Sequence, residues 1–120
     1  MSDYKLGAVE ARFADIIWEH TPLSSGELVK RCEAALQWKK PTTYTVLRKL
    51  CARGIFKNEN GTVCVVITRE EFYARQSREF VDESFAGSLP AFFAAFTAGK
   101  TLSQDDVNAL QSMIDRYKEE

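Results

Sequence analysis

The stretch KKPTTYTVLRKLCARGIFKNENGTVCVVI, residues Lys39–Ile67, decides the fold, because the period of its apolar residues changes part-way along it. In its first half the apolar residues recur at helical spacing, and at its end apolar residues alternate with other residues as in a β-strand. Pro41 suits the first turn of a helix, and Gly54 suits the left-handed position just past a helix end. Asn60 and Gly61, between β-prone flanks, predict a two-residue hairpin turn. We therefore expect a helix followed directly by a β-hairpin.

Two more helices are predicted on the N-terminal side of this stretch. Apolar spacing indicates a helix over about 7–20, and the pair Ser24 and Glu27 forms a capping box that opens a second helix. The residues expected on their buried faces are Val9, Phe13, Ile16 and Ile17, then Leu28, Val29, Cys32 and Leu36. Three helices followed by a hairpin form a winged helix-turn-helix, in which the helix before the wing is the recognition helix. The predicted fold is mainly α, with this domain at 1–68.

The recognition helix, predicted over Pro41–Arg53, is rich in hydroxyl groups and cations. Val46, Leu47, Leu50 and Cys51 are expected to face the core, which leaves Thr42, Thr43, Thr45, Arg48 and Lys49 on or near the outer side. Threonine is short enough to let a helix approach DNA, and its methyl group can contact thymine. Arginine is suited to bidentate contact with guanine, whereas lysine contacts to phosphate carry no sequence information. We therefore expect Arg48 to read a base and Lys39, Lys40 and Lys49 to bind phosphates.

Two parts of this interface stay open. Tyr44 either stacks against the core or hydrogen-bonds a phosphate, and Lys57 and Asn60 either support phosphate binding or belong to a purely structural wing. The candidate DNA-binding residues are Lys39, Lys40, Thr42, Thr43, Tyr44, Thr45, Arg48, Lys49, Lys57 and Asn60.

The charge distribution supports a nucleic-acid partner although the net charge is only −1. Residues 1–81 hold 13 basic and 10 acidic residues, and residues 82–120 hold 3 basic and 7 acidic ones. Residues 39–58 contain six basic side chains and no acidic one. Such a local basic patch is the electrostatic footprint of DNA binding. A winged helix that binds only a protein partner is the alternative.

The remaining residues, 69–120, are predicted to form a helical dimerisation domain. Six phenylalanines lie between Phe72 and Phe96, and three helices of this length cannot easily bury all of them within one chain. Apolar surface of that extent usually marks an interface, and a two-fold dimer presents two recognition helices. A self-contained helical core is the alternative. The candidate interface residues are Phe80, Phe85, Leu89, Phe92, Phe93, Phe96, Val107, Leu110, Ile114 and Tyr117.

Other function classes have little support in the sequence. Cys32, Cys51 and Cys64 are widely spaced, and His20 is the only histidine, so no zinc site or disulfide framework is expected. No catalytic set or phosphate-binding loop is present, and we expect neither an enzyme nor a cofactor. The lack of a signal peptide pattern and of a long apolar run predicts a cytoplasmic protein.

Four segments resemble the family of penicillinase and methicillin-resistance repressors, which includes copper-responsive members. They are IIWEHTPLSSGELVKRC, KPTTYTVLRKLCARGIF, TREEFYARQSREFVDESFAGSLPAFFAAF and LSQDDVNALQSMIDRY, in that order along nearly the whole chain. The combination of Trp18, Thr45, Leu50 and Gly54 with the GSL segment is the most specific part of the match. The paired C-x-C motifs of the copper-responsive members are absent.

The resemblance implies a homodimeric repressor that binds a double-stranded, palindromic operator. It implies dimerisation through the residues from about Arg69 onward. In many members a membrane-bound sensor protease detects a β-lactam, and the repressor is then cleaved before a phenylalanine. The equivalent region here is Pro90–Phe96, and the corresponding bond is Ala91–Phe92 or Ala95–Phe96.

Overall fold

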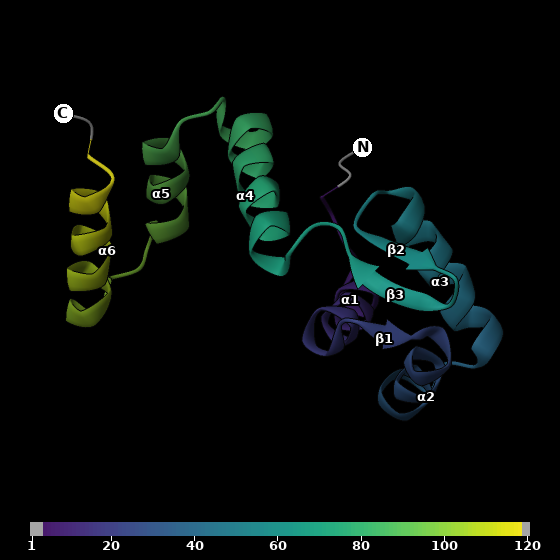
Figure 1. Ribbon diagram of the computed structural model, residues 1–120. Coiled ribbons are helices and arrows are strands. Elements are labelled where there is room, and N and C mark those ends of the chain that lie inside the picture. Colours follow the sequence, from purple (N-terminus) through teal and green to yellow (C-terminus); the bar gives the residue numbers. More distant parts are fainter. Residues whose placement is uncertain (1–3, 119–120) are drawn as a thin grey trace. The chain divides into compact units, whose positions relative to one another are not determined.

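The computed structural model describes residues 4–118, which form six helices and three short strands (Figure 1). In chain order these are α1 Ala8–His20, β1 Leu23–Ser24, α2 Ser25–Leu36, α3 Lys40–Ala52, β2 Phe56–Glu59, β3 Thr62–Val65, α4 Arg69–Phe85, α5 Leu89–Thr97 and α6 Gln104–Arg116. The mainly α class and the order of three helices followed by a hairpin are confirmed.

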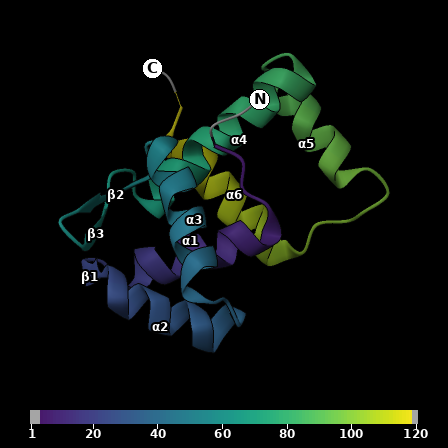
Figure 2. The same cartoon turned by 90° about the vertical axis from the view of Figure 1, so that its right-hand side faces the viewer.

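The hairpin forms as its turn residues predict. Asn60 and Gly61 both have positive φ, at 52° and 85°, as a type I′ turn requires, and β2 pairs with β3 in antiparallel fashion. In Figure 2 this turn projects from the domain as the wing. The sheet has a third strand, β1, which pairs with β3 through Leu23 and Val63 and gives the order β1-β3-β2. A strand of two residues is too short to show alternation, so no pattern in the sequence predicts β1.

Hydroxyl side chains cap α2, α4, α5 and α6, and the cap of α2 by Ser24 was predicted from the sequence. Ser24 accepts a hydrogen bond from the backbone N–H of Glu27 at 3.0 Å, and Thr68 accepts one from Glu71 at 3.1 Å. Ser88 and Ser103 do the same at the starts of α5 and α6. Gly54 has a φ of 79° just past the end of α3 and allows the chain to turn into β2.

The core of the winged helix is one cluster of buried side chains from α1, α2, α3, the sheet and the start of α4. The largest fully buried members include Phe13, Phe56, Phe72, Ile17 and Leu50. Phe72 is completely buried, so it contributes to this core. The prediction that it belongs to the exposed aromatic surface is wrong. Val9, expected on the buried face of α1, is 49% exposed because it lies in the first turn of the helix.

The chain divides into two compact units at 80/81, twelve residues beyond the boundary predicted from the sequence. The first turns of α4 carry Phe72 into the winged-helix core, and this packing extends the first unit to Phe80.

The second unit, residues 81–120, buries little of its apolar surface. No residue of α5 or α6 is buried, and the chain has no charged side chain between Leu89 and Thr97. Phe85, Phe92 and Phe96 form a short series of ring contacts, with centroids 5.7 and 6.0 Å apart. The exposed large apolar residues include Leu89, Phe93, Phe96, Val107, Ile114 and Tyr117, and Phe80 at the end of the first unit is also exposed. Among the described residues, no helix is long and apolar enough to span a membrane.

Candidate nucleic-acid interface

Helix α3 has one buried side and one exposed side. Leu47 and Leu50 are buried, as predicted for residues that face the core. Val46 and Cys51 were also predicted to face the core, and they are half-buried against it. Pro41 lies in the first turn as expected. The exposed residues are Lys39, Lys40, Thr42, Thr45, Arg48 and Lys49.

Thr43 does not belong to the exposed side, which corrects the sequence-based assignment. It is 1% exposed, and its hydroxyl donates to the backbone carbonyl of Lys39 at 3.4 Å. Thr43 precedes Leu47 by four residues and therefore lies on the same face of the helix. Thr43 lies next to Cys32. Burial raises the pKa of the Cys32 thiol to about 11, and the contact with Thr43 opposes this rise without cancelling it. We therefore remove Thr43 from the DNA-contacting set.

Thr45 is exposed, but its hydroxyl is already engaged. It donates to the carbonyl of Pro41 at 2.9 Å, one turn earlier. While this bond persists the oxygen can accept a hydrogen bond but cannot donate one. Thr45 is thus suited to contact a thymine methyl or a base amino group, and is not suited to donate to a phosphate.

The cations of α3 differ in their electrostatic partners. Among residues 4–118, no salt bridge involves Lys39, Lys40 or Arg48. Lys49 instead points its Nζ at Glu10 of α1, 2.8 Å from Oε2. This hydrogen bond lowers the pKa of Glu10, against the opposing effect of burial. An acid that is distant in sequence therefore neutralises one charge of the basic patch, and we expect less phosphate binding from Lys49 than the sequence indicated.

Tyr44 packs against the hydrophobic core as one of its partly buried neighbours. Its hydroxyl donates to Ser25 Oγ at 3.0 Å, and Lys40 Nζ lies 6.0 Å from the centroid of its ring. Of the two roles left open by the sequence, the structure favours the one in which the ring contacts the core.

The wing carries a neutralised cation. Lys57 Nζ lies 2.9 Å from Oε1 of Glu59, two residues along the same strand β2, and this hydrogen bond raises the pKa of Lys57. Asn60 is exposed at the turn itself. The wing therefore offers little free positive charge, and polar groups dominate its tip.

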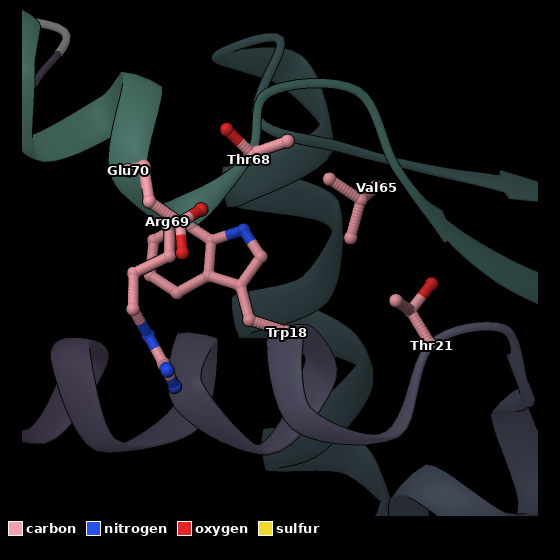
Figure 3. Close-up of a pocket in the computed structure, with 6 residues that line it drawn as sticks. All are labelled: Trp18, Thr21, Val65, Thr68, Arg69 and Glu70. Carbon is pink, nitrogen blue, oxygen red and sulfur yellow. The ribbon is translucent and has the colours of Figure 1, made fainter.

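A small hollow of about 250 Å³ lies where α1, β3 and α4 meet (Figure 3). Three of the side chains that line it, Trp18, Thr68 and Arg69, form hydrogen bonds within the protein. Trp18 Nε1 donates to the carbonyl of Ile67 at 3.0 Å, and Arg69 pairs with Asp15 and Glu19 at 3.0 and 3.3 Å while lying over the Trp18 ring. These contacts connect the start of α4 to α1 at this hollow, and we refer to them together as the α1–α4 joint. No pattern in the sequence predicts these contacts, because the residues that form them, such as Asp15 and Arg69, lie up to 54 positions apart.

We expect Trp18→Phe to weaken this joint measurably. Phenylalanine keeps an aromatic ring near Phe56 and Phe72 but cannot donate to Ile67, and a lost hydrogen bond costs about 1 kcal/mol. Urea unfolding followed by circular dichroism should show a lower midpoint with an unchanged slope. A midpoint equal to that of the unchanged chain would show that the bond contributes nothing to stability.

The described residues contain no cluster of three or more histidine, cysteine or acidic side chains that could hold a metal ion. The exposed residues at the N-cap and along α3, the helix that precedes the wing, include four cations and two threonines, namely Lys39, Lys40, Arg48, Lys49, Thr42 and Thr45. The family model described as "Penicillinase repressor" matches residues 6–116. The chain belongs to the penicillinase repressor family.

Individual relatives in this family match at low identity over most of their length. The Penicillinase repressor of Bacillus licheniformis is 22% identical over 118 residues, which cover 95% of this chain and 92% of the relative. The Methicillin resistance regulatory protein MecI of Staphylococcus aureus (strain Mu50 / ATCC 700699) is 18% identical over 117 residues, with 94% and 95% covered. A MecI protein of Mammaliicoccus sciuri is 17% identical over 117 residues. The family resemblance drawn from the sequence is confirmed, and membership makes the chain a transcriptional regulator of the repressor type.

Proposed function

We propose that this protein is a homodimeric repressor that binds a palindromic operator through α3 and the wing. The observation that carries the proposal is the exposed face of α3, where Lys39, Lys40 and Arg48 have no acidic partner among residues 4–118. A surface that a stable fold keeps cationic and unpaired is suited to a polyanionic ligand.

Each residue of this face has a distinct role in the proposal. Lys39 and Lys40 lie at the N-terminal end of α3, where the helix itself also favours phosphate, and they fix position on the duplex. Thr42 and Thr45 allow close approach to the major groove, and Arg48, two turns into the helix, contacts a guanine. Asn60, in the wing turn, contacts the phosphate backbone of the DNA, and Lys57 contributes less to this contact.

The apolar surface of the second unit supports the homodimer. Phe96 is 62% exposed and Leu89 is 64% exposed, and both lie in α5, a helix without any charged residue. Covering such surface with its equivalent on a second copy would bury it and place two recognition helices on one face of the DNA. The candidate interface residues of α6, among them Ile114, would extend the same contact.

The salt dependence of binding tests the DNA role. The logarithm of affinity for a duplex should fall linearly with the logarithm of salt concentration, by about 0.9 per neutralised phosphate. Fluorescence anisotropy with a labelled duplex, titrated at several salt concentrations, measures this slope. A flat response would contradict DNA binding and favour the alternative of a winged helix that binds a protein.

We expect Glu59→Gln to increase affinity for DNA. The substitution releases Lys57 from its pair, so the wing gains a cation that can contact phosphate. The salt slope should become steeper by about one unit per protomer, because each added phosphate contact contributes roughly that amount. The same anisotropy titration at low and high salt measures the change.

Glu33→Gln is the matched control for this variant. It removes an equal charge from an exposed position near the C-terminal end of α2. The residue of α2 that contacts the wing turn, Ser25, lies at the other end of this helix. An equal gain from both variants would mean that total charge, and not the wing, governs affinity.

The proposal includes relief of repression by cleavage in α5, as expected for a regulator of β-lactam resistance with a membrane-bound sensor protease. Ala91 and Ala95 are exposed, as is Phe96, and the helix around them has only nine residues and no buried side chain. Such a helix opens locally at low cost, which a protease requires. Mass spectrometry of the chain from β-lactam-treated cells should find an N-terminal fragment ending at Ala91 or Ala95. An intact chain after derepression would contradict cleavage.

A further inference from the structure

Ser25, the first residue of α2, contacts two other elements of the proposed DNA-binding face. Its backbone N–H donates to the carbonyl of Gly61 in the wing turn at 2.8 Å. Its hydroxyl accepts the hydrogen bond from Tyr44 of α3 at 3.0 Å. One half-buried residue thus connects the start of α2, the recognition helix and the tip of the wing.

The bond to Ser25 also sets the direction of the Tyr44 ring. Tyr44 is partly buried against the core on one side, and its hydroxyl, at the far end of the ring, is held by Ser25. The ring held in this way lies 6.0 Å from Lys40 Nζ and offers the ammonium group an aromatic face. The orientation of Tyr44 therefore affects a cation that is proposed to bind phosphate.

In the winged-helix arrangement the recognition helix and the wing must be held in a fixed relation, since both contact the same duplex. Sequence-specific contacts tolerate only small displacements, whereas contacts to phosphate by flexible lysines tolerate larger ones. The two hydrogen bonds that hold the wing turn and α3 to Ser25 should therefore influence specific binding more than non-specific binding.

We infer that Ser25 is a positioning residue for operator recognition, which acts by holding Tyr44 and the wing turn in the DNA-reading arrangement. The inference rests on the proposed DNA-binding function. It assigns the Tyr44 hydroxyl to Ser25 and not to a phosphate.

Two variants remove the bond from opposite sides. Ser25→Ala removes the acceptor and leaves the backbone bond to Gly61 available, and Tyr44→Phe removes the donor and keeps the ring. Ser25→Thr retains a hydroxyl and should restore binding. Ser24→Ala is the matched control, because the neighbouring Ser24 hydroxyl caps α2 through Glu27 and lies outside the Tyr44 contact.

The first measurement needs no DNA. In two-dimensional NMR spectra of the full chain, Ser25→Ala should shift the ring signals of Tyr44, whereas Ser24→Ala should leave them in place and only lower the melting temperature. Unchanged Tyr44 signals in Ser25→Ala would overturn the inference. This measurement stands even if the protein binds no DNA, so failure of the proposed function and failure of the inference are distinguishable.

The second measurement compares affinities for an operator fragment and a scrambled duplex of equal length. Ser25→Ala and Tyr44→Phe should each lower operator affinity by about threefold to tenfold, the range expected for one hydrogen bond, with little change for the scrambled duplex. The double variant should lose no more than either single one, because both remove the same interaction. Losses that multiply, or equal losses on both duplexes, would overturn the inference and assign the Tyr44 hydroxyl to a phosphate.

Discussion

Replacing Phe96 with aspartate should convert the proposed dimer into monomers. Phe96 is 62% exposed in the single chain and belongs to the charge-free helix α5, in contact with Phe92. In a dimer that covers this surface, the new carboxylate would be buried without a partner. Because an unpaired buried charge costs several kcal/mol, the dissociation constant of the dimer should rise by at least about 100-fold.

Sedimentation velocity over a range of protein concentrations measures this change. Phe96→Leu is the matched control, since it keeps an apolar side chain at the same position and should remain dimeric. The monomeric variant should also lose operator affinity, because two linked recognition helices bind a palindrome far more tightly than one. An intact dimer for Phe96→Asp would remove Phe96 from the interface and require α6 or another surface in its place.

Replacing Arg48 with alanine should weaken operator binding by about 1–3 kcal/mol and relax sequence preference at one base pair of each half-site. Arg48 is exposed on α3, and no salt bridge among the described residues competes for its guanidinium group. A bidentate contact to guanine is both strong and specific, so its loss affects affinity and selectivity together. Binding of a set of single-base operator variants measures both effects.

Arg48→Lys separates base reading from phosphate binding. Lysine keeps the positive charge but lacks the planar, forked donors that match guanine. If Arg48 reads a base, the lysine variant should bind scrambled DNA as the unchanged chain does and still lose discrimination at one position. Full retention of operator selectivity in the alanine variant would exclude Arg48 from base reading.

Local signals in the sequence were sufficient to predict the hairpin and the helix caps. The type I′ turn needs two residues with positive φ, and Asn60-Gly61 supplies them. Ser24 caps α2 as predicted, but the second half of the predicted capping box does not form, because the Glu27 carboxylate pairs with Arg31 at 3.1 Å. Each of these features depends on residues within a few positions of one another, and such dependence is visible in a sequence.

The features that the sequence did not reveal depend on distant contacts. Glu10 and Lys49 lie 39 positions apart, and they come together only because α1 and α3 contribute to the same core. Tyr44 and Ser25 are likewise 19 positions apart. The extension of the first unit to Phe80 follows from the burial of Phe72, whose spacing in α4 alone does not distinguish a core residue from an interface residue.

Thr43 was misplaced for a different reason. Its position, four residues before Leu47, was sufficient to place it on the buried face of α3. Its polar side chain suggested exposure, but a threonine hydroxyl can be satisfied by the backbone of its own helix, as the bond to Lys39 shows. Helical period was thus a better guide here than polarity.

Selection of genomic DNA fragments by the purified full-length protein tests the DNA-binding claim most directly. The host genome is fragmented, incubated with the protein at low salt, and the retained fragments are sequenced. The account predicts enrichment of a motif with two-fold symmetry, whose half-sites lie about one or two turns of the double helix apart. Retained fragments that share no motif and match the input in abundance would contradict it.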